Sequence, residues 1–88
     1  MLRIVELIWD ELNEEHVARH RVRREEVDEV CLGRRSLAVR IRRGRYRVIG
    51  QTESGRYLTV ILDGVGGGLF YPVTGRDSTD NERRRLQH

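Results

Sequence analysis

The sequence has little cysteine and no lysine, and it lacks any long hydrophobic run. Its single cysteine, Cys31, cannot form an internal disulfide, and no basic-then-apolar leader opens the chain. Both features favour a reducing compartment. The longest apolar runs, such as residues 57–62, have the length of a strand and are too short to span a bilayer. We therefore expect a cytoplasmic protein that does not enter a membrane.

Metal ligands are also scarce. Zinc sites need three or four Cys, His or carboxylate ligands at constrained spacing, whereas this chain offers Cys31, His16, His20 and His88. His16 and His20 stand four residues apart and could form half a site, but the spacing supplies no third ligand. No serine lies in a nucleophile-elbow motif. We expect no metal and no other cofactor.

The acidic and basic residues are unevenly distributed. Residues 1–32 hold nine acids and five arginines, a net −4, whereas residues 33–60 hold eight arginines and one acid, a net +7. All seventeen basic residues are arginine, whose planar guanidinium suits bidentate phosphate contacts. A coding bias toward arginine explains the absence of lysine equally well. The clustering predicts either a phosphate-binding surface or a solvated strand face.

Hydrophobic periodicity and turn signals predict an α+β fold. With 88 residues the chain is too short for two independent cores, so we expect one domain over residues 1–88. The expected order is an N-terminal strand, two helices, an antiparallel sheet of three to four strands, and a short C-terminal helix. The corresponding ranges are 3–8, then 10–19 and 24–32, then 37–42, 45–51, 57–63 and 69–74, and finally 80–87. Residues 52–56 and the glycine run 64–68 are expected hairpin turns, Pro72 indicates an edge strand or a bulge, and residues 79–82 have the T-x-x-E form of a capping box.

Two of these elements carry patterns that bear on function. In the first helix, His16 and His20 follow Leu12 at four-residue spacing, so both histidines are expected to share a face with apolar residues. In the first strand after Gly33, residues 37, 39 and 41 are apolar and alternate with Ala38, Arg40 and Arg42. This alternation predicts a half-buried strand with a basic outer face.

Histidine, tyrosine and arginine together suit RNA cleavage. RNA carries its own nucleophile in the 2′-OH, so cleavage needs a base, an acid and cations that stabilise the phosphorane. His20 is a candidate acid or base; its alternative role is that of a hydrogen-bonded core histidine. Tyr46 lies between two arginines, where a base can stack on it. The candidate RNA-binding residues are Arg40, Arg42, Arg45, Tyr46, Arg47 and Arg56.

Several short motifs resemble those of the BrnT family of ribonuclease toxins. Trp9-Asp10 followed by His20 and Val22 is similar to the family's W-D...K-H-G-V segment, and residues 24–30 echo its glutamate-rich second helix. Residues 45–52 resemble its R-x-x-x-I-G-x-T strand. Residues 55–60 and 73–76, followed by Glu82-Arg83, are similar to its I-S-A-R and E-R motifs. The likeness covers nearly the whole chain in the right order.

This resemblance implies a RelE-like fold, metal-independent RNA cleavage, and neutralisation by an antitoxin encoded by an adjacent gene. It implies functional roles for His20, Arg76 and Arg83, and secondary roles for Arg47 and Arg56. The sequence departs from the family pattern at Asn13, His16, Arg21 and Leu86, where the family has lysine, asparagine, glycine and tyrosine.

The leading hypothesis is therefore an endoribonuclease toxin in which His20, Arg76 and Arg83 act at the scissile phosphate. The alternative is a non-catalytic module that binds nucleic acid or protein, which the departures favour. A third possibility, that the arginine face only binds an acidic antitoxin, is compatible with either.

Overall fold

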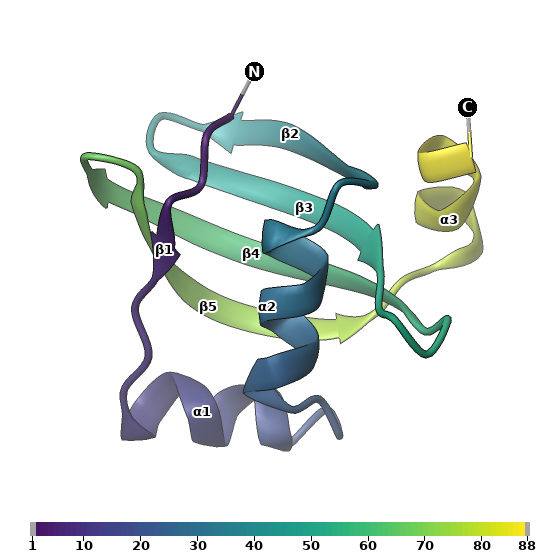
Figure 1. Ribbon diagram of the computed structural model, residues 1–88, viewed down its shortest axis with the longest axis horizontal. Coiled ribbons are helices and arrows are strands. Elements are labelled where there is room, and N and C mark those ends of the chain that lie inside the picture. The colour runs from purple at the N-terminus through teal and green to yellow at the C-terminus, as the bar shows by residue number, and fades with distance from the viewer. Residues whose placement is uncertain (1, 88) are drawn as a thin grey trace.

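The computed structural model describes residues 2–87, so His88 lies outside the described part of the chain. These residues form, in order, β1 (Glu6–Leu7), α1 (Glu11–Ala18), α2 (Arg24–Leu32), β2 (Ser36–Arg42), β3 (Arg45–Gln51), β4 (Tyr57–Gly66), β5 (Leu69–Asp77) and α3 (Asp80–Gln87), as Figure 1 shows. The predicted α+β class is confirmed. No helix in this range is long and apolar enough to cross a membrane.

The strands form a single mixed sheet in the order β1-β5-β4-β3-β2. β2 to β5 are an antiparallel meander, and β1 joins β5 in parallel through the pairs Glu6–Leu69 and Leu7–Phe70. The sheet is wider than the expected three to four strands because the short N-terminal strand also pairs with it. Pro72 lies at a bulge between β4 and β5, as its inability to donate a ladder hydrogen bond predicted.

The helices α1 and α2 cover one side of the sheet, which we call the helix face (Figure 1). Val17 of α1 and Val27 of α2 are fully buried there against apolar side chains of β3 and β4, namely Val48, Leu58, Val60 and Leu62. Alternate residues of the same strands point to the opposite side, where α3 lies, and we call this side the α3 face.

Local hydrogen bonds fix where the first two helices begin. Asp10 and Asn13 cap α1 reciprocally, with the Asn13 amide accepting from the Asp10 N–H at 2.8 Å and the Asp10 carboxylate accepting from the Asn13 N–H at 2.9 Å. Arg23 supplies no cap for α2, and Glu26 instead accepts from the Arg23 N–H at 3.0 Å.

The predicted turns are also confirmed. Residues 52–56 close the hairpin between β3 and β4, with Gly55 at a positive φ of 98°. The run of glycines from Gly64 forms the turn between β4 and β5, and Gly66, Gly67 and Gly68 all have positive φ.

The register of β2 decides which way its side chains point. Ala38 pairs with Val48 and therefore lies on the helix face, whereas Val39 pairs with Arg47 and lies on the α3 face. A bulge between Arg40 and Arg42 then brings Arg42 opposite Arg45. The arginines of β2 and β3 are thus divided between the two faces, instead of forming the single basic outer face that the alternation predicted.

Candidate nucleic-acid interface

Arginines gather on the α3 face of the sheet. Arg42 and Arg45 are cross-strand partners, and Arg47 follows two residues later in β3. Arg76 of β5 is paired with Thr59, whose hydroxyl contacts α3, so it lies on the same face. Arg83 projects from α3 over the ring of Tyr57, with its guanidinium carbon 4.6 Å from the ring centroid. These five arginines define the basic α3 face.

Glu82 is the centre of this surface. Its carboxylate accepts two hydrogen bonds from Arg76, at 2.8 and 3.1 Å, and one from the Thr59 hydroxyl at 3.0 Å. It also accepts from the Thr79 N–H at 2.8 Å, while the Thr79 hydroxyl accepts from the Glu82 N–H at 3.2 Å. The predicted capping box at the start of α3 is therefore confirmed, and its glutamate also anchors the helix to the sheet.

These contacts change the proton affinities of both partners. The hydrogen bonds from Arg76, together with those from Thr79 and Thr59, lower the pKa of Glu82 from its ordinary 4.5 to about 2, against the opposing effect of burial. The same carboxylate raises the pKa of Arg76. Glu82 is thus a permanent anion at neutral pH, fixed beneath α3.

Arg47 completes the cluster around Glu82. Its Nη1 lies 3.7 Å from the carboxylate, too far for a hydrogen bond, and its Nε is buried without a hydrogen-bond partner among residues 2–87. The cluster therefore has a guanidinium with donor capacity that Glu82 does not satisfy. The Arg47 side chain is 31% exposed, so a phosphate oxygen can approach the guanidinium from its exposed side, although not at the buried Nε.

The other arginines of the strands differ in whether an acidic side chain already occupies their guanidinium groups. Arg45 is held by Asp63 in a bidentate pair at 2.6 and 2.8 Å, which lowers the pKa of Asp63. Arg42 is exposed and forms no ion pair within the described chain. Arg40 and its partner Tyr46 lie on the helix face, where the Tyr46 ring packs edge-on against Phe70 at 5.8 Å.

Arg56 has a bracing role in this structure. Its guanidinium donates to Asp77 at 2.8 Å, to Glu26 at 3.1 Å and to the backbone carbonyl of Arg21 at 2.7 Å. These bonds join the end of β5, the start of α2 and the turn between α1 and α2. The pKa of Arg56 is raised, mainly by its hydrogen bond with Asp77.

His16 and His20 do not lie on the apolar face of the first helix, contrary to the sequence-based expectation. Asn13 and Val17 are the buried residues of α1, whereas His16 and His20 are exposed with ring centroids 6.1 Å apart. His20 lies just beyond the helix, in the turn that leads to α2. The alternative role as a buried core histidine is therefore wrong.

No family model matches the sequence, and no curated protein matches it. Among solved structures, the ribonuclease toxin BrnT of Brucella abortus, known at 1.1 Å resolution, superposes with a TM-score of 0.68. The two chains share 18% sequence identity over 85% of this chain and 97% of that toxin. This chain has the BrnT fold. The resemblance seen in the sequence motifs is confirmed at the level of the fold.

Sequence reasoning missed the residues that organise the basic α3 face of this BrnT fold. Thr59 lay within a motif-like segment but was given no role, and Glu82 was noticed only through the T-x-x-E pattern and the E-R pair. Asn13, noted as a departure from the BrnT pattern, is 2% exposed and also donates from its amide to the Ile8 carbonyl at 2.9 Å. Its capping role explains why a short side chain stands at this position.

Proposed function

We propose that this chain is a metal-independent endoribonuclease toxin of the cytoplasm, paired with an antitoxin that neutralises it. The observation that carries the proposal is the shared fold with a ribonuclease toxin, combined with the arginines that this fold gathers on the α3 face. RNA cleavage through the 2′-OH depends on positioning, proton transfer and cations, and arginine and histidine supply these without a metal.

The phosphate-binding part of the proposed site lies around Glu82. Arg76 and Arg83 would contact the scissile phosphate, and Arg47 would add the donor that Glu82 leaves free. Arg42 and Arg45 would follow the RNA backbone along the sheet. Glu82 itself, held ionised by its neighbours, orients Arg76 and is not a proton donor at neutral pH.

His20 is the proposed general acid or base. Its placement at the same end of the sheet as Arg76 supports the role, because Arg56 links the residue after His20 to the residue after Arg76. An RNA strand that passes over the edge of β5 at this end would contact both residues. Tyr46 and Arg40 lie on the helix face, so they would contact a different part of the RNA from the part that passes over β5.

The test is cleavage of an end-labelled RNA by the purified protein in EDTA, followed by denaturing electrophoresis and analysis of the fragment ends. We expect fragments with 2′,3′-cyclic phosphates, since the 2′-OH attacks the phosphate. Replacing His20 with alanine should slow cleavage by about 100-fold, the lower range of general acid-base contributions. His16→Ala is the matched control, because His16 is an exposed histidine whose ring centroid lies 6.1 Å from that of His20, and it should cleave like the wild type.

Arg83→Ala should also reduce cleavage strongly, whereas Arg84→Ala on the same helix should not. Equal rates in His20→Ala and the wild type would remove His20 from the mechanism. RNA that stays intact but is retarded on a native gel would show a binding module instead of a ribonuclease.

A further inference from the structure

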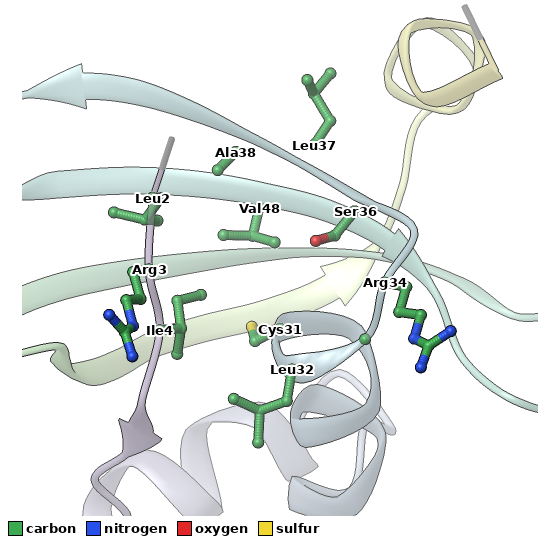
Figure 2. A pocket seen from close by; sticks show the side chains of 11 residues that line it. Leu2, Arg3, Ile4, Cys31, Leu32, Arg34, Ser36, Leu37, Ala38 and Val48 are labelled. Atoms are coloured by element: carbon green, nitrogen blue, oxygen red, sulfur yellow. The ribbon is translucent and has the colours of Figure 1, made fainter.

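A cleft of about 500 Å³ lies on the helix face, away from the arginines of the α3 face. It is enclosed by the N-terminal segment 2–4, the end of α2 and the strand β2 (Figure 2). Its walls are mainly aliphatic, with Leu2, Ile4, Leu32, Ala38 and Val48 among them. Leu32 remains 51% exposed although it lies beside the core. The cleft is thus an apolar surface that residues 2–87 do not fill.

The charges around this cleft have one sign. Arg3 and Arg34 lie on its two sides in Figure 2, and none of the described residues that line it is acidic. Arg35 is also exposed and follows Arg34 in the sequence, and none of these three arginines forms an ion pair within residues 2–87. An occupant with carboxylates beside its apolar side chains would complement both features of the cleft.

The backbone next to the cleft also has unused hydrogen-bonding groups. β2 is the last strand of the sheet, so one of its two edges has no partner strand within the described part of the chain. An extended peptide can add to such an edge through main-chain hydrogen bonds and place alternate side chains into an adjoining pocket. RNA has a charged backbone and no aliphatic side chains with which to fill this cleft. The cleft therefore fits a polypeptide better than RNA.

We propose that this cleft is the docking site for an extended acidic segment of the antitoxin, with apolar residues at alternate positions. This inference rests on the proposed function and assigns its protein partner to a surface. Because the cleft and the basic α3 face lie on opposite sides of the sheet, docking and RNA cleavage should be separable by substitution.

The test uses the polypeptide encoded by the adjacent open reading frame as the probe. Its affinity for the full chain is measured by calorimetry, and its inhibition of RNA cleavage is measured in parallel. Leu32→Glu places a negative charge in the cleft, and we expect it to weaken binding about tenfold or more. RNA cleavage by this variant should stay at the wild-type rate and become resistant to the probe.

Leu12→Glu is the matched control, because Leu12 is an exposed leucine of α1 outside the cleft. It should bind and be inhibited like the wild type. Ala38→Glu, an exposed position of β2, provides a second variant, and thermal unfolding checks that each variant is folded. Arg34→Glu tests the charge and should also weaken binding.

The outcomes separate the two proposals. A probe that binds Leu32→Glu, Ala38→Glu and the wild type equally would place the partner elsewhere and overturn the docking site alone. A probe that does not bind the wild type would overturn the toxin-antitoxin pairing and the docking site together. Loss of RNA binding in Leu32→Glu would assign the cleft to nucleic acid, and loss of a wild-type dimer in that variant would assign it to a second copy.

Discussion

Glu82 shows how one buried carboxylate can organise a basic surface. Its side chain is 9% exposed and accepts hydrogen bonds from β4, β5 and the start of α3. A buried charge is costly unless its hydrogen-bonding capacity is filled, and here arginine, threonine and backbone donors fill it. The arrangement keeps Arg76 oriented and leaves Arg47 with a free donor.

Stability should therefore depend on pH through Glu82. Because its folded pKa of about 2 lies below its ordinary 4.5, the ionised form stabilises the fold fully above pH 4.5, and this contribution is lost as the pH falls toward 2. A shift of this size corresponds to roughly 3 kcal/mol in the free energy of unfolding. We expect Glu82→Gln to be destabilised by about 2 kcal/mol at pH 7 and to lose this acid dependence.

Denaturant unfolding between pH 2 and 7 measures both effects. Glu25→Gln is the control, since Glu25 also lies in the first turn of a helix but is exposed and forms no ion pair among the described residues. If Glu82→Gln kept the wild-type pH profile, the anchoring role of Glu82 would be refuted.

At the scale of elements, α2 packs tightly against the sheet at Gly50 of β3. A Cβ added to Gly50 would lie 2.8 Å from a methyl group of Val30 and 3.4 Å from the backbone oxygen of Arg35. Gly75 of β5 faces the same core, but an added Cβ there would lie at least 3.4 Å from any neighbour, which is ordinary contact. The glycine at position 50 therefore sets the spacing between helix and sheet.

Gly50→Ala should destabilise the fold by about 1–3 kcal/mol, because the core must shift to admit the methyl group. Gly75→Ala should change the free energy of unfolding by less than about 1 kcal/mol, because the space is present. Thermal and denaturant unfolding of the two variants compares them directly. Equal stability of both would show that α2 moves away from β3 without cost.

At the scale of the whole molecule, the fold converts an uneven sequence charge into two different basic surfaces. Acidic residues are concentrated in the helical first third, and the arginines of the meander lie on both sides of the sheet. The α3 face combines arginines with hydroxyl groups and suits a phosphate backbone. The cleft beside β2 combines arginines with aliphatic walls and suits an acidic polypeptide.

RNA binding should accordingly weaken as salt is added, with a slope that depends on the α3 face. The slope of log affinity against log salt is negative, and replacing Arg42 and Arg47 by glutamine should reduce its magnitude by about 1.4, since each single-strand phosphate contact contributes roughly 0.7. Replacing Arg19 and Arg23, two exposed arginines of the helical region, should leave the slope unchanged. Fluorescence titrations of a labelled RNA at several salt concentrations measure it, and identical slopes in all variants would exclude the α3 face as the RNA-binding surface.

The sequence by itself determined the elements of this protein and their order. Period and capping signals are local, so the α3 helix, its T-x-x-E cap and the glycine turns could be predicted from a few neighbouring residues each. The tertiary structure alone decided which residues share a surface. The bulge at β2 turned Arg42 to the face of Arg45, and the fold brought Arg76 and Thr59 to Glu82. These contacts join residues far apart along the chain, and strand register, which a one-residue slip reverses, determines them.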